Sequence, residues 1–138
     1  MKDIRTALRG FLLADSAVNA ACGGRIFPSR LPQGEVRPSL VYTRISGQGD
    51  NKMDGATGLS RPRVQIDAWS QSADLASVLA NAVKDRLDGY KGDMSPANSP
   101  ADPMFVQGIF YESERDGYDN DAQLYFMSRD YFVWTEER

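Results

Sequence analysis

Apolar side chains occur at every second residue in two runs of the sequence, and this alternation constrains the fold more than any other feature. Successive side chains of a β-strand point to opposite faces, so a period of two predicts strands with one face in a core and one in solvent. We therefore expect a sheet with one buried face. The alternating residues are Val41, Thr43 and Ile45 within residues 40–47, and Val64, Ile66 and Ala68 within residues 63–69.

Two longer, aromatic-rich runs lie near the end of the chain, FVQGIFYESERDGYD and AQLYFMSRDYFVWTE. Aromatic and β-branched side chains fit the pleated surface of a sheet, and a short acidic segment separates the runs. Gly117 suggests a turn near the end of the first run, because glycine is frequent in turns. These runs predict an antiparallel hairpin.

The first helical segment covers residues 2–13, where apolar residues fall on one stripe at helical spacing. Asp15 can cap a short second helix over residues 16–21, and Gly23 with Gly24 can end it. The apolar stripe consists of Ile4, Leu8, Phe11 and Leu12.

A second main helix is predicted after Ser70 or Ser72, either of which can cap it, and Gly89 ends it. Its apolar residues follow the spacing of one helix face, so this helix should pack on the sheet. The residues of this stripe are Leu75, Val78, Leu79, Ala82, Val83 and Leu87.

Three segments show neither periodicity. Residues 25–39 contain three prolines, which favour an irregular, extended connector. Residues 46–60, SGQGDNKMDGATGLS, contain four glycines and no apolar cluster, so we expect a long mobile loop or the extended tip of a hairpin. Residues 91–103 form a second polar linker.

The order helix, strand, strand, helix, strand, strand predicts an α+β fold. In this fold two main helices pack on one face of an antiparallel sheet of about four strands, with long polar loops between elements. A length of 138 residues suits one domain over residues 1–138.

The composition excludes several classes of protein. The chain has no histidine, which removes the commonest general base and metal ligand, and its single cysteine, Cys22, can form no internal disulfide. The formal charge is -3, and the 16 basic residues are scattered, so we expect no sequence-specific binding to nucleic acid. No apolar run reaches the roughly 20 residues that cross a bilayer. We expect folding in the cytoplasm, no membrane span and no cofactor.

Carboxylates are the remaining candidates for catalysis or metal binding, since paired acids hydrolyse glycosides and bind divalent cations. Glu112 and Glu114 are expected to share the solvent face of a strand, and residues 116–121 fit a turn. The glycines of residues 46–60 lack the GK[ST] ending of a phosphate-binding loop. We therefore expect neither a catalytic nor a metal-binding role for the candidate acids, which are Asp67, Asp74, Glu112, Glu114, Asp116, Asp119 and Asp121.

Aromatic side chains are numerous for a sheet with one buried face, so some of them should point outward. Exposed aromatic residues are typical of interfaces, and we expect a partner-binding surface here. The aromatic residues concerned are Trp69, Tyr111, Tyr125, Tyr131, Phe132 and Trp134.

Ordered motifs over almost the whole chain resemble the tail-completion family of tailed bacteriophages, which includes tail-to-head joining proteins. The most specific motifs are GGRIFPSRLPQG with the adjacent PSLVY, followed in order by RVQIDAW, LDGY, VQGIF, ERDGYD and SRDYFVW. None of them is a catalytic signature. The segment MSPANSPADP before VQGIF departs from the tight turn expected there.

The resemblance implies a structural protein of a phage or prophage, not an enzyme. Such a protein assembles as a ring, usually a hexamer, caps the tail tube, ends its polymerisation and joins tail to head. Its partners are further copies of itself, the tail-tube protein and a head-completion connector, first in the host cytoplasm and then at the head-tail junction of the virion. The long loop and one strand residue are expected to form the interface: Gln48, Asp50, Lys52, Met53, Asp54, Thr57 and Trp69.

Several other functions fit the same sequence. A head-completion connector or a tail-tube subunit is the nearest alternative. A small metal-dependent enzyme would need Asp67 or Glu112 to converge with another acid in a pocket. A monomeric adaptor would not form a ring.

Overall fold

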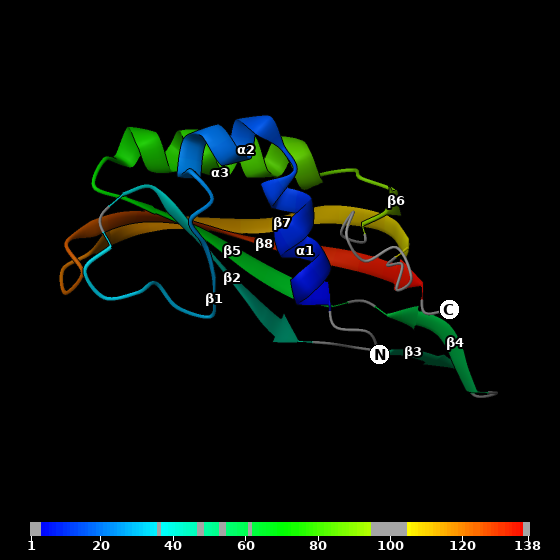
Figure 1. The fold of residues 1–138 in the computed structure, drawn as a ribbon. Helices are drawn as coiled ribbons and strands as arrows, with labels where there is room; N and C mark the ends of the chain where they lie inside the picture. Colours follow the sequence, from blue (N-terminus) through cyan, green and yellow to red (C-terminus); the bar gives the residue numbers. More distant parts are fainter. Residues whose placement is uncertain are drawn as a thin grey trace.

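The computed structural model describes residues 4–35, 37–46, 49–52, 55–60, 62–94 and 105–136. The elements form two layers, with the helices over one face of a curled sheet (Figure 1). The helices are α1 (Ile4–Leu13), α2 (Ser16–Cys22) and α3 (Ala73–Leu87). The strands are β1 (Ile26–Pro28), β2 (Ser39–Ser46), β3 (Gly49–Lys52), β4 (Gly55–Ser60), β5 (Arg63–Ser70), β6 (Gly92–Asp93), β7 (Phe105–Asp119) and β8 (Leu124–Glu136).

The sheet is built around β8, which pairs with β5 and β4 on one side and with β7 on the other. β2 and then β1 follow beyond β5, and β6 follows beyond β7. The predicted α+β arrangement, with helices on one face, is therefore correct in outline. The expected four strands are too few, because the described residues contain eight, whereas the three helices correspond to the two main helices and the short helix predicted after Asp15.

The polar segment 46–60 extends the hairpin of β2 and β5. Of the two predictions for this segment, the extended hairpin tip is therefore the correct one. β3 and β4 pair in antiparallel fashion, with Gly49 opposite Ser60. The β3–β4 hairpin lies beyond the end of β2 and projects away from the helices (Figure 1). Its strands carry little apolar sequence, so pairing along the backbone defines this extension.

The prolines of residues 25–39 predicted an irregular connector after α2, but part of this connector forms a strand. Ile26, Phe27 and Pro28 pair in parallel with β2. Proline cannot donate a ladder hydrogen bond, and it is tolerated here because β1 is an edge strand. The buried side chain of Ile26 ties this strand to the core.

The β7–β8 hairpin confirms the predicted pair of aromatic strands, but its turn does not lie at Gly117. Gly117 is paired with Phe126 inside the ladder, and the turn covers residues 120–123. There the carboxylate of Asp119 accepts hydrogen bonds from the backbone of Asp121 and Ala122, at 2.9 and 3.1 Å. A β-carbon on Gly117 would lie 3.0 Å from the Phe126 ring, so glycine here makes room for an aromatic side chain.

Local signals fixed the helix ends. Asp15 caps α2 by accepting from the backbone of Val18 at 3.0 Å, and Gly23 ends the helix in the left-handed conformation. Of the two candidate caps for α3, Ser72 is the N-cap, and Gly89 follows the helix with a φ of 81°.

Leu75 and Val78 do not belong to the buried face of α3, contrary to the predicted stripe. They are 50% and 58% exposed, whereas the buried residues of this helix are Ala76, Leu79, Ala80, Val83 and Leu87. A helix that lies on a sheet buries only the arc that faces the strands. Helix α2 packs beside α3 but leaves these two side chains uncovered.

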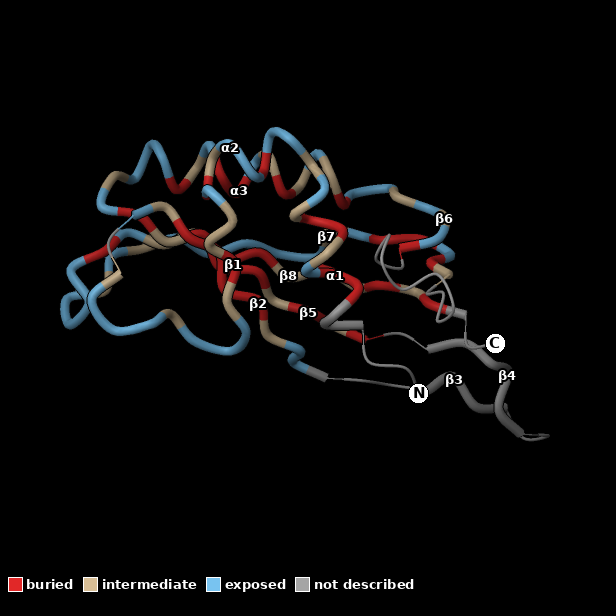
Figure 2. The backbone as a smooth tube through the Cα atoms, viewed as in Figure 1, coloured by how far each residue is buried: buried red, intermediate tan, exposed pale blue. Residues whose placement is uncertain are grey.

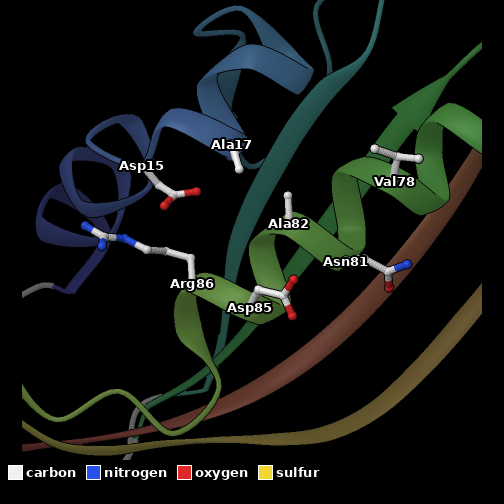
Figure 3. A pocket seen from close by; sticks show the side chains of 7 residues that line it. All are labelled: Asp15, Ala17, Val78, Asn81, Ala82, Asp85 and Arg86. Carbon is white, nitrogen blue, oxygen red and sulfur yellow. The ribbon is translucent and has the colours of Figure 1, made fainter.

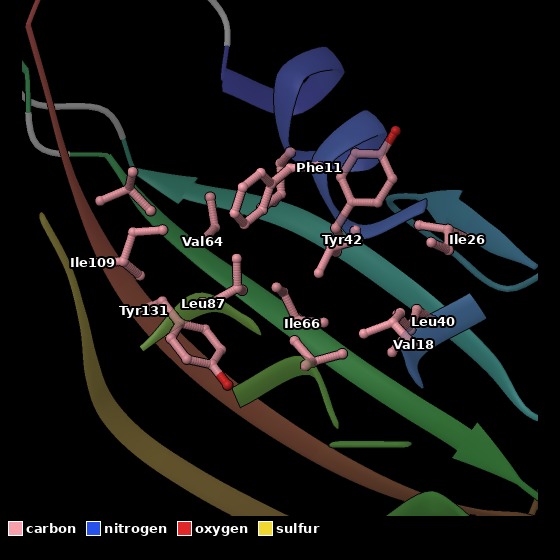
Figure 4. Close-up of a cluster of buried hydrophobic side chains, with 14 of the residues drawn as sticks. Phe11, Val18, Ile26, Leu40, Tyr42, Val64, Ile66, Leu87, Ile109 and Tyr131 are labelled. Carbon is pink, nitrogen blue, oxygen red and sulfur yellow. The ribbon is translucent and has the colours of Figure 1, made fainter. Parts of the chain in front are cut away.

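The core lies between the two layers, where buried side chains from all three helices meet those of the central strands (Figures 2 and 4). In the first alternating run the phase differs from expectation, since Tyr42 enters the core while Ile45 is 49% exposed. A register shift between Arg44 and Ser46 separates Ile45 from the regular alternation. Within the described residues, no helix is long and apolar enough to cross a membrane.

Candidate interaction surfaces

The sheet has one face under the helices and one that none of the described helices covers (Figure 1). Val64 and Ile66 of β5 point into the core, so the alternate side chains of β5 point to the other side. Residues paired across neighbouring strands share a face, which extends this surface over β8 and β7. We call it the open face; it consists of Arg63, Gln65, Asp67, Trp69, Phe126, Ser128, Asp130, Phe132, Phe110, Ser113, Arg115 and Gly117.

The middle of the open face is polar and recessed. The amide nitrogen of Gln65 donates to the two carboxylate oxygens of Asp67 at 2.9 and 3.2 Å. A guanidinium nitrogen of Arg63 donates to the carboxylate of Asp130, and the Ser113 hydroxyl donates to the same oxygen at 3.4 Å. Asp67 is only 9% exposed although none of the three described helices lies over it. Each of the two acids therefore accepts hydrogen bonds from neighbouring side chains, and we call the two groups together the open-face network.

The charge of Asp67 is disfavoured at this position. Burial raises the pKa of its carboxyl group, and the neighbouring Asp130 raises it further. Hydrogen bonds from Ser128 and Gln65 and the positive charge of Arg115 lower it, but burial dominates. Covering this surface with another protein would strengthen the same effect.

A hollow of about 250 Å³ lies beside this network. Its lining brings together side chains from β5, β7 and β8: Gln65, Ser113, Glu114, Arg115, Ser128 and Asp130. Asp67 thus has a second acid nearby, Asp130, which the sequence-based candidates did not include. Both acids accept hydrogen bonds from neighbouring side chains, and the described residues contain no group of three or more His, Cys, Asp or Glu that could hold a metal ion.

Aromatic rings flank the polar middle on both sides. Trp69 and Phe126 stack at 5.2 Å between ring centroids at one end. At the other end the Arg63 guanidinium lies 5.6 Å from the centroid of Phe132, and the paired Phe110 is 55% exposed. The open face therefore presents apolar rings around charged groups, a composition typical of protein interfaces.

A buried arginine joins the sheet to α3 on the helix side. Arg129 is 8% exposed and donates to the Ala80 carbonyl at 3.0 Å and to the Asn81 amide oxygen at 2.9 Å. It also forms an ion pair with Glu114 at 3.0 Å. Glu114 therefore does not simply share a solvent face with Glu112, because the register of β7 shifts between Tyr111 and Ser113.

The outward side of the helix layer is apolar and acidic. Five of its exposed residues on α3 form what we call the outer stripe: Asp74, Leu75, Val78, Asn81 and Asp85. A groove of about 490 Å³ runs between this stripe and α2, with Ala17 and Ala82 inside it and Asp15 and Arg86 at its rim (Figure 3).

The cations of α3 are turned away from the outer stripe. Lys84 lies 4.5 Å from the ring centroid of Tyr111. Arg86 lies 3.7 Å from that of Phe11 and donates to the Phe11 carbonyl at 3.2 Å. The negative charges of Asp74 and Asp85 therefore dominate the outer stripe.

The structure places only part of the predicted interface. Gln48, Met53 and Asp54 lie outside the described residues. Asp50 and Lys52 are in β3 and Thr57 is in β4, where the backbone alone is described. Trp69 is half-buried on the open face, and these seven residues remain a prediction.

The other predicted residues occupy varied positions. Among the aromatic residues Tyr131 is buried, Tyr125 is exposed, and Tyr111, Phe132 and Trp134 are half-buried. Cys22 is buried, and burial raises the pKa of its thiol. The remaining candidate acids are separate from the open-face network: Asp74 lies in α3, Glu112, Asp116 and Asp119 lie in β7, and Asp121 lies in the following turn.

Comparisons with known proteins identify the family. The family model described as "Tail completion protein gp17" matches residues 6–136. A chain of the solved structure "Virion of native gene transfer agent (GTA) particle" shares the fold, with a TM-score of 0.74 at 16% sequence identity over 96% of this chain and 94% of that chain. No curated protein sequence matches. The chain therefore belongs to the tail completion protein gp17 family.

Proposed function

We propose that this protein caps the tail tube, ends tube polymerisation and joins the tail to the head, as a ring of several copies, with six as the expected number. The observation that carries the proposal is the family match over residues 6–136, nearly the whole chain. The protein acts by occupying a surface, so no catalytic group and no cofactor are required.

A cap needs two unlike surfaces. One must bind the last ring of the tube, and the other must offer no surface for a further tube ring while accepting a head-completion connector. Both surfaces must be distinct from those that join the copies within the ring.

The β3–β4 hairpin is the element we assign to contacts with neighbouring proteins. It projects past the sheet (Figure 1), and only its last residues, Leu59 and Ser60, pair with β8. A hairpin that extends from a sheet can pair with or pack on another chain at little cost to its own fold. We assign Gln48, Asp50, Lys52, Met53, Asp54 and Thr57 to this contact, together with Trp69 on the open face.

The direct test is the mass of the purified protein, alone at high concentration and in the presence of isolated tail tubes. We expect a closed oligomer, or its formation on tube ends visible by electron microscopy. A protein that stays monomeric under both conditions contradicts the ring. If the protein bound only along the sides of the tube, or only to connectors, a head-completion role would be favoured instead.

A further inference from the structure

Two of the surfaces described above, on opposite sides of the sheet, each carry exposed apolar side chains. Among the described residues, Leu75 and Val78 are 50% and 58% exposed on the outer stripe of α3. Phe110 is 55% exposed on the open face, where it is paired with Phe132. Clustered exposed apolar groups mark binding surfaces in soluble proteins. Each copy of this protein thus carries two such surfaces that differ in shape and chemistry.

We propose that the outer stripe of α3 in one copy docks on the open face of the next copy. This inference rests on the proposed ring and specifies which surfaces meet in it. The occupant of the open face is a second copy of this chain, whose helix would cover the sheet from the side that its own helices leave bare. The central strands would then lie between two helix layers.

The outer stripe carries carboxylates, and the described residues of the open face offer one exposed cation that is not paired with its own acids, Arg115. The outer stripe is acidic, because Asp74 and Asp85 face outward while Lys84 and Arg86 lie against aromatic rings. On the open face Asp67 and Asp130 accept hydrogen bonds from Gln65 and Arg63, and Arg115 is exposed with its guanidinium 5.9 Å from the Phe126 centroid. A carboxylate of the outer stripe could pair with Arg115 beside an apolar contact.

The open face is shaped for such a contact by two glycines of β7. A β-carbon on Gly108 or Gly117 would lie 3.0 Å from the ring of Phe110 or Phe126 respectively. The missing side chains let these rings lie down against the strand instead of standing away from it. A helix can therefore approach the sheet between the aromatic ends.

Symmetry requires this contact to form rings or filaments rather than pairs. A twofold dimer joins the same patch of both copies, whereas two unlike patches on opposite sides join head to tail. A head-to-tail contact closes into a ring if the rotation between copies allows it. The arrangement of the patches therefore agrees with the proposed assembly without involving the β3–β4 hairpin.

The test uses two variants that each remove one patch. Val78→Asp places a charge in the outer stripe, and Phe110→Thr removes the ring from the open face while keeping strand propensity. Gln33→Asp adds the same charge at an exposed connector position and serves as control. Circular dichroism and thermal melting check that all three variants fold. Mass is measured for each variant alone and for an equal mixture of Val78→Asp and Phe110→Thr.

We expect each patch variant to lose assembly, with self-association at least tenfold weaker than in the wild type, while Gln33→Asp assembles normally. The mixture should form a dimer of twice the 15.3 kDa chain mass, because one variant keeps an intact open face and the other an intact outer stripe. If the wild type forms rings and both variants also form them, the proposed docking of these two faces is wrong, but the proposal that the protein assembles as a ring is retained.

A mixture that remains monomeric also overturns the docking. A Phe110→Thr variant that forms rings but no longer binds tube ends would assign the open face to the tube protein instead. A wild type that stays monomeric even with tube ends removes both the docking and the proposed ring.

Discussion

Two adjacent residues of α3 should respond very differently to truncation. Leu79 is 0% exposed in the core, whereas Val78 is 58% exposed on the outer stripe. Leu79→Ala removes buried methyl and methylene groups, worth about 0.8 kcal/mol for each CH₂, and leaves a cavity between α3 and the sheet. The free energy of unfolding should therefore fall by about 2–5 kcal/mol, the range found for buried Leu→Ala changes.

Val78→Ala is the matched control, because it shortens an aliphatic side chain in the same helix. It should change the free energy of unfolding by no more than about 0.5 kcal/mol. Equilibrium urea unfolding of the two variants and the wild type, under conditions where all are monomeric, measures both values. Equal losses would mean that α3 packs with a different phase, and the assignment of the outer stripe would be withdrawn.

Three further predictions concern the sheet. Arg129→Met should lower the free energy of unfolding by about 1.5–3 kcal/mol in the urea assay, because it removes the charged hydrogen bonds that join β8 to α3. An unchanged free energy of unfolding would contradict this role of Arg129. The pKa of Asp67 is raised in the folded state, so the native protein holds this proton more tightly than the unfolded chain and the contribution of Asp67 to stability falls as pH rises above about 3.9. The melting temperature of Asp67→Asn relative to the wild type should therefore increase with pH, and a constant difference would refute this. Deleting residues 48–57 should leave the melting temperature nearly unchanged but weaken association with neighbours, as seen by mass measurement; a normal assembly would move the interface away from the hairpin.

Short-range signals predicted much of the fold. Asp15, Ser72 and Gly23 mark helix ends by their own backbone chemistry, and the alternation along β5 placed Val64 and Ile66 in the core. Long-range pairing escaped prediction. β1 forms only because β2 lies beside it, and the residues of β6 carry no strand periodicity of their own.

The open face was predicted only in part. Trp69 was singled out, but its partner Phe126 and the network of Arg63 with Asp130 depend on the register between β5 and β8, which sequence spacing does not define. The polar and aromatic residues at every second position of SRDYFVW, namely Ser128, Asp130, Phe132 and Trp134, were the available signal for this surface. Gly117 was misread as a turn because a glycine that makes room for a ring looks the same in a sequence as one that bends the chain.

The central claim is that this protein ends the tail tube and joins it to the head. Deleting its gene and examining lysates by electron microscopy tests that claim most directly, because tail length and attachment are both visible. We predict tails that exceed their normal length or remain unattached, beside heads that still fill with DNA. Tails of normal length on normal heads would contradict the account.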